Sequence, residues 1–373
     1  MATDKAGAQL AQGGGPVLLP VALLVGLLAL AVDALHLQLG RVGWGDMIAP
    51  LMDPADDRVR DVFTGLAPVD GFLKVIIAIF EPLLLLERPE YSLYGLQFGG
   101  QAVAIITVFL VQGLRETNRG NVIRFAIFWG MGMQAVGFAV VVPVFYVLDL
   151  VLSSSKPQTA TLRNPERLFT VIPAFGLGYI LPSILQVLPL ERDVHQMLIV
   201  VWQFVPLYVA LLLPLFAGVF KRLSVGQTGA AQDRRRFDRD ALQSAYGFAI
   251  AVGAMTQWAA LSAILVARLA PHLFPGNNDA VAERLTFTNV FVPDPPHGHG
   301  PTTIADASRH FLLYDQYLGS AAGLVWAVAR ASRAGIFSGS VADFREIVKD
   351  VVFLGPQSAV VSLMWKTDEA LLA

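Results

Sequence analysis

The sequence predicts an all-α protein, a polytopic bundle of transmembrane helices. Hydrophobic residues occupy 55% of the 373 positions and charged residues 15%, whereas a soluble domain usually carries about 25% charged residues. The apolar residues are gathered into stretches close to the roughly 20 residues that a membrane-spanning helix needs. Glycine and proline are spread through these stretches, which is common in membrane helices.

Eight stretches are candidates for spanning helices, and a ninth is short. The eight occupy residues 16–39, 72–86, 94–114, 122–152, 168–188, 197–220, 245–269 and 311–329. The ninth, 351–365, is interrupted by Gly355 and Pro356, so it either spans, lies at the interface or caps the bundle. We expect a polar tail at 1–15 and a single transmembrane catalytic domain over 16–373. The first apolar stretch is longer than the core of a signal peptide and lacks a clear cleavage site, so we expect it to be retained.

Charge and composition exclude several classes of function. The formal net charge is −2, which gives no reason to expect nucleic acid as a partner. The absence of cysteine excludes disulfides and thiolate metal sites. The sequence contains neither a glycine-rich phosphate loop followed by lysine nor an HExxH zinc motif. Nothing in it indicates an oligomeric state.

A basic loop predicts the orientation in the membrane. Residues 221–240 include Arg234, Arg235, Arg236 and Arg239, and the positive-inside rule places such a loop in the cytosol. With eight spans, the loops that follow the first, third and seventh helices would then share the lumenal face. The turn at 115–119 and the start of the last span would therefore lie in the same half of the bundle.

Glu81 is the clearest candidate for chemistry. It lies in the middle of an apolar segment and is followed by Pro82, which frees a backbone carbonyl one turn earlier. An ionisable group inside a membrane helix is costly, and it indicates a functional residue by default. Apolar surroundings favour the neutral acid, which could donate a proton. The alternative is a structural hydrogen bond to another helix.

Asp315 is the second candidate acid, about one turn into the last predicted span. His310 and Tyr314 are four residues apart and share a helix face with each other. The alternative is an interfacial helix start, where the helix dipole favours an acid. Glu116 and Asn118 lie in the turn before the fourth span, and Arg124 follows at its start. A solvated turn with charge pairs is the alternative there.

Tryptophans and amides could complete a site near these acids. Trp129 and Trp202 fall in the predicted lumenal half and Trp258 falls near the middle, although single tryptophans more often belong to an interfacial belt. Gln101 and Gln134 lie inside helices, where amides usually join helices but can also orient a substrate.

An aspartate-rich stretch keeps a second class of enzyme open. Asp57 and Asp61 have the four-residue spacing with which membrane prenyltransferases hold Mg²⁺ on a diphosphate. The usual opening Asn-Asp is missing, and Asp233 and Asp238 are five apart rather than four. A solvated loop is the simpler interpretation.

Several short motifs together resemble a known family. They are Phe80-Glu81-Pro82, Gly99-Gly100-Gln101, Arg115-Glu116-Thr117-Asn118-Arg119, Phe128-Trp129-Gly130, Val290-Phe291-Val292-Pro293, Tyr314-Asp315 and Leu363-Met364-Trp365-Lys366. With them the chain resembles, over nearly its whole length, the membrane-bound terpene cyclases of fungal meroterpenoid pathways, of the ascofuranone, ascochlorin and macrophorin type.

The resemblance implies a reaction and a substrate class. Such enzymes protonate a farnesylated phenol, or its terminal epoxide, and need no metal or cofactor. The implied partners are a lipophilic prenylated small molecule and membrane lipid, and the implied location is the endoplasmic reticulum membrane. A buried acid can start this reaction, aromatic faces stabilise the cation, and exclusion of water prevents quenching. Glu81 or Asp315 would donate the proton, and the other acid or Glu116 would assist or accept the final proton. A transporter or receptor remains the non-enzymatic alternative.

Overall fold

A computed structural model describes residues 17–373 except 42, 86, 224–230, 275–277 and 296–300. The tail expected at 1–15 therefore lies outside the described residues. The described part of the chain is helical and contains no strand, apart from one isolated antiparallel bridge between Arg115 and Leu162. The predicted all-α class is confirmed.

The helices have the following bounds: α2 Leu18–Val32, α3 Gln38–Arg41, α4 Trp44–Ile48, α5 Ala67–Leu84, α6 Pro89–Leu114, α7 Ala126–Val136, α8 Phe138–Ser153, α9 Val171–Phe175, α10 Leu181–Leu185, α11 Arg192–Trp202, α12 Val205–Leu223, α13 Ala231–Leu269, α14 Asn278–Arg284, α15 Phe287–Phe291, α16 Ile304–Arg333, α17 Val341–Leu354 and α18 Pro356–Leu372. Single π-helical turns, Asp33–Leu37 and Gly176–Ile180, continue α2 into α3 and α9 into α10.

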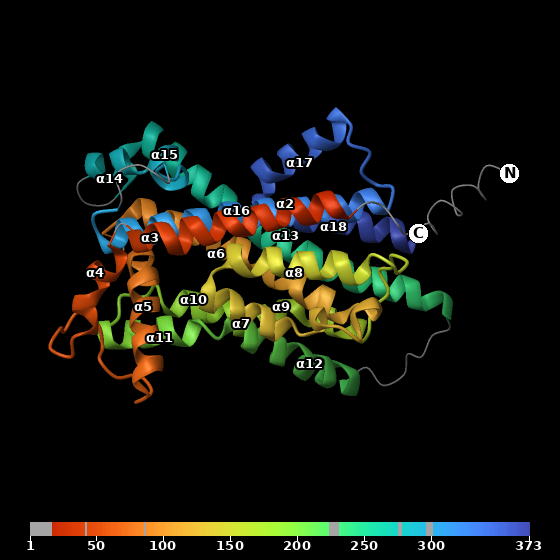
Figure 1. Ribbon diagram of the computed structural model, residues 1–373, viewed down its shortest axis with the longest axis horizontal. Helices are drawn as coiled ribbons and strands as arrows, with labels where there is room; N and C mark the ends of the chain where they lie inside the picture. The colour runs from red at the N-terminus through yellow and green to blue at the C-terminus, as the bar shows by residue number, and fades with distance from the viewer. Residues whose placement is uncertain (1–16, 42, 86, 224–230, 275–277, 296–300) are drawn as a thin grey trace.

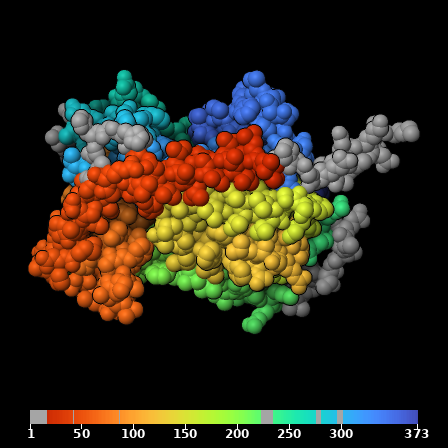
Figure 2. All heavy atoms as spheres, viewed as in Figure 1, coloured from red at the N-terminus to blue at the C-terminus, as the bar shows by residue number. Residues whose placement is uncertain are grey.

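Most of the long helices run along the long axis of the molecule (Figure 1). Helices α4, α5 and α11 gather at one end, whereas α14–α15 and α17 project from one side. Figure 2 shows α2 lying across the outer surface. Many of its side chains are accordingly exposed, and Leu18, for example, is 80% exposed. An apolar helix with this exposure is suited to contact with lipid.

Five helices are long and apolar enough to cross a membrane: Leu18–Arg41, Pro89–Leu114, Pro165–Leu185, Val205–Arg222 and Arg234–Leu269. These segments agree in position with five of the predicted spans. The expected number of eight is not confirmed by the described residues. Helices α7 and α8 are apolar but shorter than a span.

Segment 122–152, predicted as one span, is a helical hairpin. The backbone turns at Gly137, whose φ of +98° is a conformation that glycine adopts readily. Trp129 on α7 packs edge-on against Phe145 on α8 with ring centroids 5.3 Å apart. Two residues sixteen positions apart in a continuous helix would be separated by about 24 Å. Helices α7 and α8 therefore fold back on each other.

This hairpin overturns the predicted grouping of the loops. Arg115 pairs with Leu162 in the isolated bridge, and the guanidinium group of Arg234 donates a hydrogen bond to the carbonyl of Leu162. The turn after α6 therefore lies at the same end as the basic segment, which we call the basic end. Glu116, Asn118 and Arg124 are not in the half of the bundle opposite the basic loop, because 122–152 returns instead of crossing.

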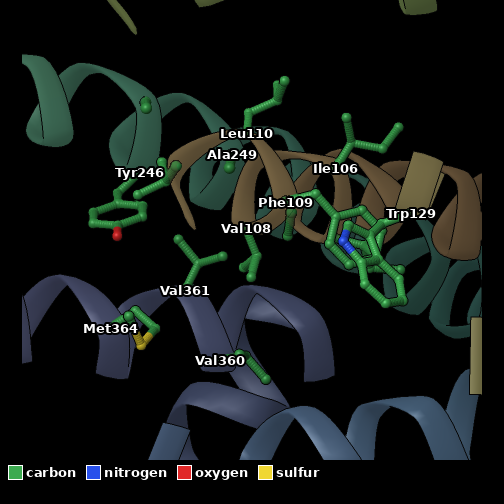
Figure 3. Packing of buried hydrophobic residues seen from close by; sticks show 14 of the residues in the cluster. Ile106, Val108, Phe109, Leu110, Trp129, Tyr246, Ala249, Val360, Val361 and Met364 are labelled. Carbon is green, nitrogen blue, oxygen red and sulfur yellow. The ribbon is translucent and has the colours of Figure 1, made fainter. Parts of the chain in front are cut away.

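The central core lies where α6, α13 and α18 meet (Figure 3). Phe109 and Val108 from α6, Tyr246 from α13 and Val361 from α18 are labelled in this cluster and are almost completely buried. Small residues let the backbones approach, as at Gly100, where an added Cβ atom would come within 1.9 Å of the Thr256 hydroxyl.

Gln101 joins α6 to the break between α17 and α18. Its Nε2 donates to the carbonyls of Gly253 and Leu354, and its Oε1 accepts from the amides of Gln357 and Ser358, all at 3.0 Å. This amide therefore satisfies three backbone groups left free where the chain turns at Gly355, and it joins them to α13 through the Gly253 carbonyl.

Candidate functional site

A cavity of about 570 Å³ lies between α5, α6, the α7–α8 turn, α10, α13 and α16. Its volume falls within the range of about 300–1,000 Å³ that is usual for small-molecule sites. The wall is predominantly apolar, with residues such as Ile79, Leu83, Ile105, Phe138 and Leu312. Its outer lining includes Leu96, Ile184 and Met255, which are at least half exposed, so the cavity opens onto an apolar surface.

Asp315 on α16 is the carboxyl group that lines this cavity, and it is only 4% exposed. The amide of Ala139 donates to Asp315 Oδ1 at 2.7 Å, and the amide of Phe138 is a second backbone donor to the carboxyl group. Both amides belong to the first turn of α8, where N–H groups lack partners within the helix. The N-terminus of α8 thus fixes the carboxyl group at the cavity wall.

Gly137 makes this arrangement sterically feasible. A Cβ atom on Gly137 would lie 2.9 Å from Asp315 Oδ1, closer than side chains normally approach. Position 137 therefore requires glycine for two reasons. The hairpin turns there with a positive φ, and Asp315 occupies the space that a side chain would need.

Three aromatic rings form one part of the wall. Trp202 lies 5.8 Å from Phe80 and 5.8 Å from Tyr179, measured between ring centroids. The indole Nε1 of Trp202 donates to the Ser183 hydroxyl at 2.8 Å, and the Tyr179 hydroxyl donates to the carbonyl of Gly99 at 2.6 Å. The polar edges are satisfied within the protein, so each ring can meet an apolar ligand. Tyr179 is on the π-helical turn, a feature often found at functional sites.

Glu81 lies in a different place from Asp315. It lines a separate cleft of about 740 Å³ together with Arg58, Arg88 and Thr303, and it is partly exposed. Gln196 Nε2 donates to Glu81 Oε1 at 3.0 Å. The expectation of one cavity containing both acids is therefore wrong, because α5 turns Phe80 to the apolar cavity and Glu81 to the polar cleft.

Three of the predicted site residues line the apolar cavity: Asp315, Trp202 and Gln134. Trp129 is instead buried in the core, where its Nε1 donates to the carbonyl of Val122 at 3.1 Å. Trp258 is 46% exposed and packs beside Phe353. The side-chain amide of Gln101 forms its hydrogen bonds with backbone groups of α13 and of the α17–α18 turn.

The other predicted residues are placed at the two ends of the bundle. At the basic end, Glu116 is exposed, and buried Asn118 donates to the carbonyl of Gln112 at 3.0 Å. Arg124 lies over the ring of Phe125 in another pocket. Towards the start of α16, His310 packs on Tyr314 with ring centroids 4.7 Å apart, and the Tyr314 hydroxyl donates to the carbonyl of Asp294.

Of the two aspartates that suggested a diphosphate site, Asp57 and Asp61, the second is engaged in a local ion pair. Asp61 pairs with Lys74 at 2.7 Å. A hydrogen bond from the Arg58 side chain lowers the pKa of Asp56 to about 2. Among the described residues, no group of three or more His, Cys, Asp or Glu side chains is arranged to hold a metal ion.

Sequence reasoning missed Phe80, Tyr179, Phe138 and Gly137 as cavity residues. Phe80 and Tyr179 are aromatic residues in apolar runs, where most rings simply fill a core. The break at Gly137 carried the only usable signal, a glycine in the middle of a stretch of 31 residues, 122–152, which is longer than a single span requires.

Comparison with known proteins gives a consistent result. The profile of the CtvD domain matches residues 22–372. Terpene cyclase janA of Penicillium janthinellum is 30% identical over alignments that cover 92% of this chain and 94% of the relative. Terpene cyclase ascI of Acremonium egyptiacum is 26% identical, covering 84% of this chain and 82% of the relative. Terpene cyclase atmA of Aspergillus flavus is also 26% identical, with coverage of 84% and 85%. No solved structure matches.

Proposed function

This chain belongs to the CtvD-domain family and is a terpene cyclase, and from that premise we propose that it cyclises a farnesylated phenol, or its terminal epoxide, by protonation. The observation that carries the proposal is Asp315, the one carboxyl group among the described residues that line a predominantly apolar and aromatic cavity. A hydrocarbon chain fits such a wall, and the one acid marks where the reaction begins.

In the first step, Asp315 donates the proton. Ala139 donates to Oδ1, which suits the carbonyl oxygen of a neutral acid and leaves the hydroxyl on Oδ2. This O–H protonates the terminal epoxide oxygen, breaking a C–O bond, or the terminal alkene carbon. Either event leaves a tertiary carbocation and the Asp315 carboxylate. The amides of α8 stabilise that carboxylate as it forms.

The later steps use the shape and the rings of the cavity. A neighbouring double bond attacks the cation, a new C–C bond forms, and the positive charge moves along the folded chain. Phe80, Tyr179 and Trp202 offer ring faces to this charge, each contributing about 0.5–2 kcal/mol. Loss of a proton, or capture by a hydroxyl group that then loses its proton, ends the reaction. The released proton returns to the Asp315 carboxylate, directly or through a water molecule, so the acid is restored and the protons balance without a metal.

We also place the enzyme in the endoplasmic reticulum membrane as a multi-pass protein. Five apolar helices and a cavity that opens between exposed apolar residues support the membrane part of this placement, and the endoplasmic reticulum is what the family resemblance implies. A prenylated substrate dissolved in the bilayer could then enter from the side.

Replacement of Asp315 tests the proposal. We expect Asp315→Asn to reduce cyclisation by about 100-fold or more, since general acid catalysis contributes about 10²–10⁴. Microsomes from a host without related enzymes would be fed farnesylated phenols and their epoxides. Products would be separated by retention time and identified by NMR, because cyclisation leaves the mass unchanged.

Glu81→Gln is the informative comparison, because this acid lines the neighbouring polar cleft. We expect it to keep activity within a few-fold of the unmodified enzyme. Full activity of Asp315→Asn, in protein of normal melting temperature, would falsify the assignment of the donor. Equal losses in both variants would instead connect the polar cleft to the reaction.

A further inference from the structure

A second pocket lies at the basic end. It has a volume of about 750 Å³ and is lined by Arg124, Arg163 and Arg167 together with apolar side chains from α6, α7 and α12. We call it the arginine pocket. Helices α7 and α12 lie side by side at this place (Figure 1).

The three arginines carry positive charge without carboxylate partners. Among the described residues, none of the three makes an ion pair, and no acidic side chain lines the pocket. Glu166, which precedes Arg167 in the sequence, makes no ion pair with the three arginines among the residues that the structure describes. Arg163 Nη2 donates to the carbonyl of Gly113 at 2.7 Å, while its Nε is buried without a hydrogen bond to the described residues.

The remaining wall is apolar and faces outward. Phe125 and Phe128 line the pocket and are 49% and 62% exposed. Leu211 and Leu215, on the adjoining helix α12, are also more than half exposed. Cationic groups at the end of an apolar helical surface match a ligand with an anionic head and hydrocarbon tails.

The position of the pocket strengthens this match. Leu162, the neighbour of Arg163, accepts a hydrogen bond from Arg234 of the basic segment. The positive-inside rule places that end at the cytosolic leaflet, where anionic lipids are enriched. Guanidinium groups bind phosphate oxygens in a bidentate manner.

We propose that the arginine pocket binds the phosphate headgroup of an anionic phospholipid, with the acyl chains lying along the exposed faces of α7 and α12. This site is distinct from the cyclisation cavity, since the two share no lining residue. The bound lipid would hold the α7–α8 hairpin against α12. The proposal does not depend on the cyclase mechanism.

The test uses the full-length protein purified in a neutral detergent. Short-chain phosphatidic acid, short-chain phosphatidylcholine and inorganic phosphate would be titrated separately, with melting temperature and native mass spectrometry as readouts. We expect phosphatidic acid to bind and to raise the melting temperature. We expect phosphatidylcholine and inorganic phosphate to have little effect at the same concentrations.

Two double variants separate a specific pocket from general surface charge. Arg124→Gln with Arg167→Gln removes two pocket charges but keeps Arg163, which supports the backbone at Gly113. We expect phosphatidic acid binding to weaken on the order of 25-fold, from about fivefold for each charge. Arg235→Gln with Arg236→Gln removes two exposed charges outside the pocket, and binding should change less than about fivefold.

Equal losses in the two double variants would overturn the proposal, as would equal binding of phosphatidylcholine. Full competition by inorganic phosphate would identify a site for a soluble anion and overturn the lipid assignment. Should the first double variant fail to fold, Arg167→Gln alone gives the same comparison against Arg235→Gln. The side chain of Arg167 makes no hydrogen bond with the described residues.

Discussion

Trp202 combines a fixed polar edge with an apolar ring at the cavity wall. Its Nε1 is held by Ser183, and its ring lies between those of Phe80 and Tyr179. A partly buried indole is stabilised by such a partner for its N–H group, and the bond also restricts how the ring can rotate. The ring is therefore positioned before any substrate arrives, as the proposed stabilisation of a short-lived cation would require.

Removal of this ring should slow cyclisation and change the products. We expect Trp202→Leu to reduce the rate about 2- to 30-fold, corresponding to about 0.5–2 kcal/mol of lost cation stabilisation. A larger cavity also admits water, so hydrated products should increase. Liquid chromatography with mass spectrometry would detect them, because added water changes the mass.

Trp258→Leu is the matched control, since Trp258 is half exposed and does not line the cavity. It should leave both rate and products unchanged. If the two tryptophan variants behave alike, Trp202 acts through general stability and not through its ring.

The α7–α8 hairpin is the element that brings a helix N-terminus to Asp315. Helix α7 ends at Val136 and α8 begins at Phe138, so the whole reversal depends on one residue, Gly137. The reversal presents the unpaired amides of Phe138 and Ala139 to α16. A continuous helix through 122–152 would have satisfied these amides internally.

Gly137→Ala should disturb the hairpin and the acid together. The residue would be held in an unfavourable conformation costing about 1–3 kcal/mol, and its Cβ atom would displace the Asp315 carboxyl group. We expect a lower melting temperature and at least about a 10-fold loss of activity. Thermal unfolding in detergent and the microsomal assay would measure the two effects.

Gly132→Ala provides the comparison within the same hairpin. Its added Cβ atom would make ordinary contact, 3.5 Å from Val141, and alanine favours the helix. Unchanged or higher stability is expected there. A Gly137→Ala variant that matched Gly132→Ala in stability and activity would contradict the role given to the turn.

On the scale of the whole molecule, a buried ion pair joins distant parts of the chain at the basic end. Arg115, just after α6, donates through Nη2 to both carboxylate oxygens of Asp368 on α18, at 2.8 and 2.7 Å. Tyr246 on α13 donates to the same carboxylate at 2.7 Å. The three helices that form the core are thereby fixed at one end as well as along their length.

Breaking this pair should destabilise the entire bundle. We expect Asp368→Asn to reduce the free energy of unfolding by about 3–5 kcal/mol, because Arg115 would remain buried without a counter-charge. The melting temperature of the purified protein measures the effect. The neighbouring Glu369→Gln removes a half-exposed contact with Arg239 and should cost at most about 1 kcal/mol. Similar losses in the two variants would contradict a special role for the buried pair.

Features that depend on a residue or segment by itself were predictable from the sequence. Hydropathy depends on composition, so helical segments such as 94–114 and 245–269 were predictable. The same kind of signal selected Asp315, since an ionisable residue in an apolar helix is unfavourable without a purpose. The structure places it on the cavity wall, and its catalytic role stays a prediction. The same rule selected Glu81, but the side of α5 on which a polar cleft forms depends on packing with distant segments.

Other features depend on contacts that composition does not encode. A hairpin and a continuous helix can bury the same apolar residues, so the only sign of a reversal in 122–152 was a glycine within a stretch longer than one span requires. Asp368 lies among Lys366 and Glu369, where a solvated end is the ordinary expectation. Its burial follows only from the approach of Arg115 and Tyr246.

Leu96, Ile184 and Met255 border an apolar mouth of the cavity. Such a mouth is suited to receive substrate from the bilayer and not from the surrounding water. An enzyme loaded from within a bilayer responds to the mole fraction of substrate among the lipids and not to its concentration in the surrounding buffer. Adding lipid without substrate lowers this mole fraction and would therefore lower the rate of such an enzyme. The proposed prenylated substrate and its cyclised product would be similarly lipophilic and would compete for the same entrance, so product accumulation in the membrane would itself slow the reaction.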